Sequence, residues 1–311
     1  MSAKSPVPRY SWTGPVDHTI PVDKSKIKGK SVIITGGANG MGEVAARRFI
    51  IDGAFVTVGD MDVKRGEALE AELKGKLKFV KCNIKSWEDQ VALFETAIAD
   101  GRGVDVVIAN AGISRSSGDN PNGPPEKPDL NIVETNVNGT LYTFKLATHY
   151  FRKQPIERDR SFMMTGSLTA WIDSPGNWEY TASKYALRGL MRTVRRSSWE
   201  QGIRINFIGP NYIKSAIRTP EYEKYLMDLG VRFGEAEDVA SCMERLAADH
   251  TINGHSLMIV PRAVAKEGYM DVQDDDHVDG KREYFAGEQA IQLNIIKDQW
   301  LDGVPTQIYK R

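Results

Sequence analysis

The sequence has no excess of charge of either sign. Its 41 lysines and arginines equal its 41 aspartates and glutamates, so the formal net charge at pH 7 is zero. Proteins that bind nucleic acids or anionic membranes through electrostatic attraction usually carry a basic excess. We therefore expect no nucleic-acid partner and no membrane partner, and a small-molecule ligand agrees best with this balance.

Cysteines, metal-ligand patterns and long apolar runs are also scarce or lacking. Cys82 and Cys242 are the only cysteines, too few for a disulfide framework or a thiolate metal cage. The histidines have no metal-ligand spacing, and the acidic run 274–276 lacks the closing glutamate of a calcium loop. No eighteen consecutive residues are apolar, and the first fifteen residues do not read as a secretory signal. We expect a soluble, cytoplasmic protein without a metal site.

Between residues 30 and 260, short apolar runs alternate with amphipathic stretches. The strand-like runs are 31–35, 54–59, 77–82, 104–109, 161–165, 203–208 and 256–260. The helical stretches are 43–52, 64–74, 87–100, 130–151, 180–201 and 235–249. Short, continuous apolar strands separated by helices are typical of a parallel sheet covered on both faces. The pattern predicts one doubly wound α/β domain with a seven-stranded parallel sheet.

The two ends of the chain lack this alternation. Residues 1–29 contain repeated prolines without periodicity, which predicts an N-terminal arm. Residues 261–311 are a predicted C-terminal extension, so the domain limits are 1–29, 30–260 and 261–311. Two irregular stretches interrupt the domain itself, a proline-rich loop at 114–129 and a candidate flap at 212–234.

A glycine-rich turn follows the first strand. Gly36, Gly40 and Gly42 lie between strand 31–35 and the next helix. Glycine allows a tight turn and close backbone approach, and a helix start offers free N–H groups to phosphate. Such turns also serve packing alone, but the strand–turn–helix context at the start of a βαβ unit favours a dinucleotide site.

The second strand ends at Asp60, 24 residues after Gly36. An acidic side chain at this point accepts hydrogen bonds from an adenosine ribose and repels a 2′-phosphate. Asn39 and Met61, where a basic residue could bind that phosphate, are neutral. The sequence therefore predicts NAD as the cofactor, although the nearby basic pair at 64–65 leaves NADP open.

Tyr180 and Lys184 lie one helical turn apart on the same face. An unperturbed phenol has a pKa of about 10 and is a poor base near neutrality. A neighbouring ammonium group favours the phenolate and lowers that pKa, which makes the tyrosine a plausible general acid and base. A tyrosine and a lysine at this spacing are common on helices that have no catalytic role, so the pair indicates catalysis only in combination with the glycine turn.

Taken together, these residues resemble the short-chain dehydrogenase/reductase family in its single-domain branch. The matching residues, which follow the family's order and approximate spacing from 30 to 260, are Thr35-Gly36-x-x-x-Gly40-x-Gly42, Asn110-Ala-Gly112, Asn136, Ser167, Tyr180-x-x-x-Lys184, Gly202-Ile-Arg-Ile-Asn206, Pro210, Glu237-Asp-Val-Ala240 and Asn253-Gly254. The resemblance implies a Rossmann-type sheet and hydride exchange between a nicotinamide and an alcohol or carbonyl. It also implies a homodimer or homotetramer.

The resemblance assigns roles to individual residues. Ser167 would bond to the reacting oxygen and Tyr180 would give or take its proton. Lys184 would bind the nicotinamide ribose, and Asn136 would bind a water that links Lys184 to solvent. The cofactor contacts implied are Gly36, Asn39, Gly40, Met41, Gly42, Asp60, Asn83, Ile84, Asn110, Gly112, Tyr180, Lys184, Ile213 and Ser215.

The chain departs from the family pattern at a few positions. Asn83 stands where the family often has aspartate, and Asn211 follows Pro210 where glycine is usual. Ser215 is the only match to a threonine near the carboxamide. The last strand runs into residues 260–262 without the usual glycine pair, which puts family-like tetramer contacts in doubt.

These residues predict an NAD-dependent oxidoreductase that interconverts a secondary alcohol and a ketone. Cellular NAD is mostly oxidised, so oxidation is the favoured direction. Trp171, Trp178 and Tyr212 flank the catalytic segments and suggest a bulky, apolar substrate.

Three alternatives stay open to different degrees. The first is a non-catalytic NAD-binding scaffold, which would be expected to have lost part of the tetrad. The second is an NADP(H)-dependent ketone reductase. Enoyl reduction is disfavoured, because that branch usually places six residues between the tyrosine and the lysine and this chain has three.

Overall fold

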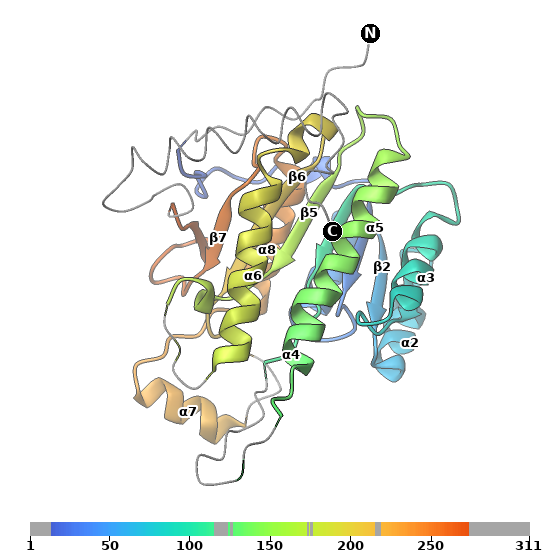
Figure 1. Ribbon diagram of the computed structural model, residues 1–311. Helices are drawn as coiled ribbons and strands as arrows, with labels where there is room; N and C mark the ends of the chain where they lie inside the picture. The colour runs from blue at the N-terminus through green and yellow to red at the C-terminus, as the bar shows by residue number, and fades with distance from the viewer. Residues whose placement is uncertain are drawn as a thin grey trace, which may run out of the picture. The chain divides into compact units, whose positions relative to one another are not determined.

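In the computed structural model of the protein, one eight-stranded sheet forms the centre of the described chain. The structure describes residues 14–114, 124, 127–172, 174, 177–214 and 219–273. The strand order is β3-β2-β1-β4-β5-β6-β7-β8 (Figure 1). Strands β1 to β7 are mutually parallel, and β8 runs antiparallel to β7. The predicted doubly wound Rossmann-type fold with seven parallel strands is confirmed, and β8 adds an edge that the sequence pattern did not predict.

The strands and helices alternate through the described chain. The strands are β1 Ser31–Thr35, β2 Phe55–Asp60, β3 Leu77–Lys81, β4 Val106–Ala109, β5 Ser161–Thr165, β6 Arg204–Pro210, β7 Ser256–Ile259 and β8 Tyr269–Asp271. The α-helices are α1 Gly40–Ile51, α2 Val63–Glu72, α3 Trp87–Ile98, α4 Asn131–Val133, α5 Thr140–Arg152, α6 Trp178–Val194, α7 Pro220–Asp228 and α8 Ala236–Ala248. A π-helical turn, Glu134–Gly139, joins α4 to α5, and short 3-10 turns lie at Lys24–Lys26, Leu168–Ala170 and Ser198–Gln201.

Helices cover both faces of the sheet. Val32 and Ile34 of β1 pack into the apolar cluster formed with α1, α2 and α8. Ile33, between them, packs into the opposite cluster with α3, α5 and α6, three helices that cross the front of the sheet in Figure 1. Since successive side chains of a strand point to opposite faces, a strand buried on both sides must be apolar throughout. This explains the continuous apolar runs in the sequence.

Three predicted segments differ from the structure. The helix predicted at 130–151 contains the π-helical turn 134–139, and the helix predicted at 180–201 ends at Val194. The irregular flap predicted at 212–234 contains α7. Its start had a readable signal, because the Thr219 side chain accepts the N–H of Tyr222 and Pro220 opens the first turn.

The segment after residue 14 and the segment before residue 272 pack against the same edge of the domain. The N–H of Val16 donates to Asp271 Oδ2 at 2.9 Å, and Arg245 of α8 donates to the carbonyls of His18 and Ile20. The chain divides into two compact units after Val272. The predicted limits 1–29, 30–260 and 261–311 stay predictions, and residues 1–13, 274–311 and most of the loop 114–129 lie outside the described residues.

A buried charge cluster ties the amino-terminal ends of the central strands together. Asp159, just before β5, pairs with Lys30 and with Arg204 Nη2, the latter at 3.0 Å. Arg204 is fully buried, and its Nη1 also donates to Leu246 O at 2.7 Å. Burial opposes ionisation of Asp159, but the charges of Arg204 and Lys30 outweigh it and lower the pKa of this carboxyl.

We expect Asp159→Asn to lower the free energy of unfolding by about 3 kcal/mol, because it leaves the Arg204 guanidinium buried without its counter-charge. A carboxyl with a depressed folded-state pKa stabilises the fold above its unfolded pKa of about 3.9, and this stabilisation is lost as the pH falls through the folded value. The variant should therefore lack part of the wild-type acid transition. Urea unfolding between pH 7 and pH 3 measures both effects. Asp228→Asn, which breaks the exposed Lys224–Asp228 pair, is the control and should cost below about 0.5 kcal/mol.

Candidate functional site

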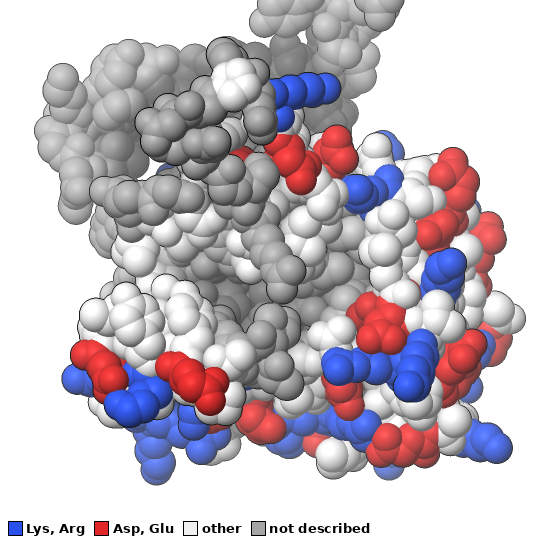
Figure 2. Space-filling view, turned by 90° about the horizontal axis from the view of Figure 1, so that it is seen from below, with Lys and Arg blue, Asp and Glu red and all other residues white. Residues whose placement is uncertain are grey.

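The candidate site lies at the carboxyl ends of the parallel strands. The strand order reverses between β1 and β4, and ligands of open α/β sheets bind outside such a switch point. The start of α6, α4 and α7 all lie toward this end, at the bottom of Figure 1. Figure 2 looks onto it and shows the described lysines, arginines, aspartates and glutamates interspersed around the rim.

The glycine turn brings α1 against the end of β1. Gly36 has a φ of +66°, and a Cβ there would lie 2.8 Å from the Cα of Ala111. A Cβ at Gly42 would lie 2.1 Å from Gly36 O, so only glycine permits this approach. The structure therefore has the predicted turn between β1 and α1, and close packing of the backbone requires glycine at Gly36 and Gly42.

The start of α1 has the features of a phosphate site. Asn39 precedes the helix but makes no side-chain cap, so the first N–H groups stay available. Gly40 has a φ of +55° and open space where a Cβ would point. An uncapped helix start beside open space fits a pyrophosphate group through N–H donation and the helix dipole. Gly40 and Met41 would be the donors nearest to it.

Asp60 ends β2 and faces the glycine turn. Its Oδ2 accepts the N–H of Ala38 at 3.0 Å, and its Oδ1 accepts the N–H of Asp62 at 3.0 Å. A carboxylate has about four acceptor positions, so it can still accept ribose hydroxyls. Met61 is exposed, and Arg65 points to Asp62 at 3.5 Å. The carboxylate is thus placed by the turn itself at the position predicted to select the cofactor.

Asn83 and Ile84 follow β3 on the same edge. The N–H of Asn83 donates to Asp89 Oδ2 at 2.8 Å, and Asn83 Oδ1 accepts the N–H of Lys85 at 3.1 Å. Ile84 is buried. The asparagine therefore stabilises the local turn while the loop keeps a fixed place beside Asp60.

Asn110 connects three strands at the switch point. Its Nδ2 donates to Gly36 O at 3.0 Å and to Thr35 O at 3.3 Å, and its Oδ1 accepts the Thr165 hydroxyl at 3.2 Å. The carbonyl of Thr165 in turn accepts Lys184 Nζ at 3.1 Å. Asn110 and Thr165 thus connect the glycine turn to Lys184. Thr165 was missed by the sequence analysis, since a threonine at a strand end is unremarkable by itself.

Asn136 lies in the π-helical turn and is buried. Its Nδ2 donates to Ile113 O at 2.9 Å and to Ser183 Oγ at 3.0 Å, while its Oδ1 accepts the N–H of Ile113 at 2.9 Å. A Cβ at Gly112 would lie 3.0 Å from that Oδ1 and 3.6 Å from Lys184 Nζ. π-helical turns often occur at functional sites, and this one brings Asn136 close to Lys184.

Ser167 and Tyr180 meet in this site. The Ser167 side chain is buried just after β5 and lies near enough to the Tyr180 hydroxyl to influence its ionisation. Burial raises the pKa of Tyr180, and the nearby Ser167 side chain opposes that rise. The structure therefore brings the predicted acid–base residue and its predicted partner together. It does not give the lowered tyrosine pKa expected from the lysine alone, because removal of the phenol from water favours its neutral form.

Lys184 is buried at the centre of the site. Its ammonium lies 5.4 Å from the centre of the Tyr180 ring. Burial lowers the pKa of Lys184 to about 8. The lysine is therefore poised to change protonation near neutral pH, whereas an exposed lysine titrates at about 10.4.

The remaining predicted residues that the structure describes are Ile213, just after β6, and three aromatic side chains. Ile213 is buried and forms an isolated bridge with Gly234, which closes the segment that carries α7. Ser215 lies outside the described residues. Trp171 packs edge-on against Phe207, whereas Trp178 and Tyr212 are exposed. Of the three aromatic residues suggested for a substrate pocket, Trp171 therefore contributes mainly to the core.

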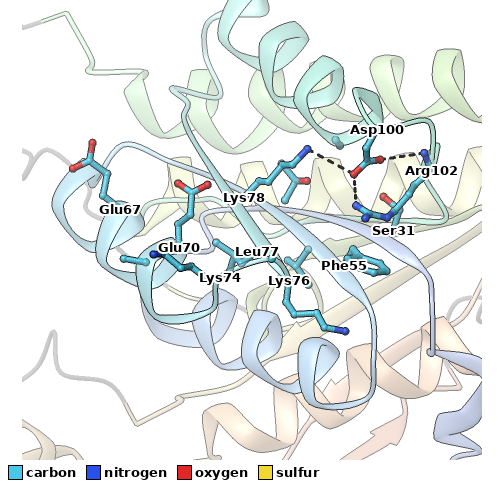
Figure 3. Close-up of a pocket in the computed structure, with 15 residues that line it drawn as sticks. Ser31, Phe55, Glu67, Glu70, Lys74, Lys76, Leu77, Lys78, Asp100 and Arg102 are labelled. Atoms are coloured by element: carbon cyan, nitrogen blue, oxygen red, sulfur yellow. Dashed lines mark hydrogen bonds and ion pairs between the residues drawn. The ribbon is translucent and has the colours of Figure 1, made fainter.

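A hollow of 570 Å³ lies elsewhere, at the amino-terminal ends of β2 and β3. Figure 3 shows Asp100, on the rim of this hollow, paired with both Lys78 and Arg102. The Arg102 guanidinium also covers the Phe55 ring at 3.7 Å. Because parallel strands carry ligands at their carboxyl ends, this hollow is not the catalytic site.

Among the described residues, no helix is long and apolar enough to cross a membrane. In the same part of the chain, no group of three or more histidine, cysteine, aspartate or glutamate side chains is arranged to bind a metal ion.

The fold and the site define a nicotinamide-dependent oxidoreductase of the Rossmann type. The family model described as short chain dehydrogenase matches residues 30–226. The chain belongs to this family, which acts on the CH–OH group of alcohols and binds NAD(P).

Curated relatives span most of the chain. A 5′-hydroxyaverantin dehydrogenase of Dothistroma septosporum is 28% identical over 294 residues, which cover 86% of this chain and 93% of the relative. The NADP-dependent dehydrogenase M3 of a Phoma species is 29% identical and covers 87% of this chain and 85% of its own length. The short-chain dehydrogenase reductase ATA1 of Arabidopsis thaliana is 31% identical and covers 74% of this chain and 90% of its own length.

Solved structures share the fold. A 3-ketoacyl-(acyl-carrier-protein) reductase from Brucella melitensis, complexed with NADH, superposes with a TM-score of 0.67 at 23% identity. The match covers 75% of this chain and 97% of that chain. At this identity, the likeness concerns the fold.

We expect Lys184→Met to abolish turnover and yet raise the free energy of unfolding at pH 7 by about 2 kcal/mol. Lowering the lysine pKa from 10.5 to about 8 corresponds to a cost of about 3 kcal/mol for the buried charge, from which about 1 kcal/mol is subtracted for the lost bond to Thr165 O.

The sign of the pH dependence follows from proton binding. Between pH 8 and 10.5 the unfolded chain binds the Lys184 proton and the folded chain does not, so wild-type stability rises with pH through this window. The advantage of the variant should shrink over the same range. Urea unfolding at several pH values measures it, with exposed Lys224→Met as control. If the free energy of unfolding of Lys184→Met at pH 7 is no higher than that of the wild type, the cost assigned to the buried charge is wrong.

Proposed function

We propose that this protein oxidises a secondary alcohol on a bulky, largely apolar small molecule to the ketone, with NAD as the cofactor. The observation that carries the proposal is the meeting of Ser167, Tyr180 and Lys184 in one buried site connected to the glycine turn. Asn136 lies near Lys184, which supports a shared role for the four residues of the tetrad that the family resemblance implies.

Each side chain has a task that its geometry supports. Ser167 would bind the alcohol oxygen while Tyr180, in its phenolate form, removes the hydroxyl proton. Lys184 would bind the nicotinamide ribose with the donors that Thr165 O leaves free, and its charge favours the phenolate. The bound dinucleotide supplies the hydride acceptor and, when oxidised, a positive charge beside Tyr180. Positioning of the two carbons would supply much of the rate.

The preference for NAD rests on Asp60. Its carboxylate is fixed toward the glycine turn by the Ala38 N–H, where a 2′-phosphate would meet a negative charge. The related dehydrogenase M3 is named NADP-dependent, which keeps the NADP(H)-dependent ketone reductase as the second candidate. The two candidates differ in cofactor and in direction, and both use the same tetrad.

The bulky substrate is supported by the relatives and by exposed aromatic side chains. Two curated relatives are named for 5′-hydroxyaverantin, so we propose a substrate of specialised metabolism. Trp178 and Tyr212 are exposed near the catalytic segments, and Tyr222 and Tyr225 are stacked and exposed on α7. Aromatic faces of this kind suit an extended apolar ligand.

The scaffold alternative is weakened by the intact tetrad. A protein that only bound the dinucleotide would not need a buried Ser167 beside Tyr180. The homodimer or homotetramer and the cytoplasmic location stay predictions from the sequence.

A screen of NAD⁺ reduction over secondary alcohols of graded size tests the function. We expect turnover to rise with the apolar bulk of the alcohol, and Tyr180→Phe to reduce kcat by roughly 10²–10⁴-fold because the proton acceptor is removed. Tyr185→Phe, an exposed tyrosine on the same helix, is the matched control and should keep its activity. Full turnover by Tyr180→Phe would refute the mechanism.

The cofactor preference is tested by Asp60→Asn. This change keeps the size of the side chain but removes the negative charge, so the ratio of kcat/KM for NAD⁺ to that for NADP⁺ should fall by about tenfold or more. Glu67→Gln removes an exposed charge from the neighbouring α2 and should leave the ratio unchanged. A wild-type protein that binds NADPH and not NADH would overturn the assignment.

A further inference from the structure

Gln90 is a fully buried amide on the first turn of α3. Its Nε2 donates to Ile84 O at 2.6 Å and to Gly139 O at 2.9 Å. Both amide hydrogens are thus used, and they bind two backbone carbonyls that lie far apart in the sequence. A buried polar group with both donors satisfied fixes the elements that it joins.

The orientation of this amide is determined by its surroundings. Gln90 Oε1 accepts the Thr143 hydroxyl at 2.7 Å, and that hydroxyl lies 2.9 Å from Gly139 O. Exchanging the amide oxygen and nitrogen would place the oxygen against two carbonyl oxygens. Only one orientation of the Gln90 amide is therefore compatible with its surroundings, and in it the Nε2 donates to the carbonyls of Ile84 and Gly139.

One of the bound carbonyls, that of Ile84, belongs to the loop after β3, which we call the cofactor loop because its Asn83 and Ile84 are candidate cofactor contacts. The adjacent N–H of Asn83 is bound by Asp89, the residue before Gln90. The first turn of α3 therefore binds two consecutive residues that are candidate contacts for the dinucleotide. This leaves the loop little freedom to shift independently of α3.

The other carbonyl ends the π-helical turn that carries Asn136. A Cβ at Gly139 would lie 2.7 Å from Ile84 Cδ1, so the turn and the loop are in direct contact. Three residues earlier, Asn136 binds the backbone of Ile113 and the Ser183 hydroxyl of α6. A displacement of Gly139 is therefore transmitted to the amide of Asn136 and to the helix that carries Tyr180.

We propose that Gln90 is a positioning residue that clamps the cofactor loop at Ile84 to the π-helical turn at Gly139. The clamp keeps Asn136 in place and couples the dinucleotide site to the proton-transfer site. This inference rests on the proposed function, because it assigns Gln90 a part in that same reaction.

Gln90→Met tests the clamp, because methionine has a similar length and no donor. We expect kcat to fall by about tenfold and NADH to bind about threefold to tenfold more weakly, since small displacements of reacting groups are costly. Thr143→Val removes the contact to Oε1 but keeps both donated bonds, so its effects should be smaller. Thr96→Val is the control, because that hydroxyl bonds only to Ala92 O within α3.

A double-mutant cycle separates positioning from general stability. If Gln90 acts through Asn136, then Gln90→Met in an Asn136→Ala protein should lower kcat little further, whereas independent effects would multiply. Urea unfolding shows whether all variants are folded under assay conditions. Thr143→Val provides the same comparison if the methionine variant does not fold.

NADH binding, followed by protein fluorescence, needs no alcohol. Weaker NADH binding in Gln90→Met but not in Thr96→Val supports the clamp, whether or not an alcohol is oxidised. A failure to oxidise any alcohol would contradict only the proposed function. The clamp is overturned if Gln90→Met keeps both kcat and NADH affinity within about twofold of wild type, or if its effect on kcat multiplies fully with that of Asn136→Ala.

Discussion

The arrangement of the site depends on the side chain of Asn110. β1 and β4 are paired neighbours, and beyond their carboxyl ends the chain turns to opposite faces of the sheet at the switch point. The Asn110 amide bridges this point by bonding to Gly36 O and to the Thr165 hydroxyl, and the Thr165 carbonyl accepts Lys184 Nζ. One amide thus sets the distance between the turn that fits a pyrophosphate and the lysine that would bind the nicotinamide ribose. The positions that would bind the pyrophosphate and the nicotinamide ribose of a dinucleotide are therefore held at a fixed distance from each other.

The burial of the site favours other protonation states than the proposed reaction needs. Lys184 and Tyr180 are removed from water, which lowers the pKa of the lysine and raises the pKa of the tyrosine. Both shifts favour neutral forms, while the proposed reaction needs a phenolate beside an ammonium group. A positively charged nicotinamide, when bound, would favour the phenolate and so would oppose the shift that burial imposes on Tyr180. Such a site has its pKa values adjusted by the cofactor as well as by the fold.

The sequence predicted what depends on local pattern and not what depends on tertiary geometry. The apolar runs of β1 to β7 reflect burial, and the spacing of Tyr180 and Lys184 reflects helical periodicity, so the parallel sheet and the proximity of these two side chains could be predicted. The π-helical turn at 134–139 has no such signal, because its extra residue is stabilised by contacts of Asn136 and Gly139 with distant segments. The raised pKa of Tyr180 was missed for the same reason, since burial is a property of the folded chain.

The far edge of the sheet is completed by the two ends of the described chain. β8 pairs with β7, and its Asp271 accepts the N–H of Val16 across 255 residues of sequence. Pairing of β8 covers an edge that would otherwise offer free backbone groups to other chains. During synthesis, however, residue 16 leaves the ribosome long before residue 271. The N-terminal segment must therefore wait without Asp271 until nearly the whole domain has emerged, which makes this closure a late event in folding.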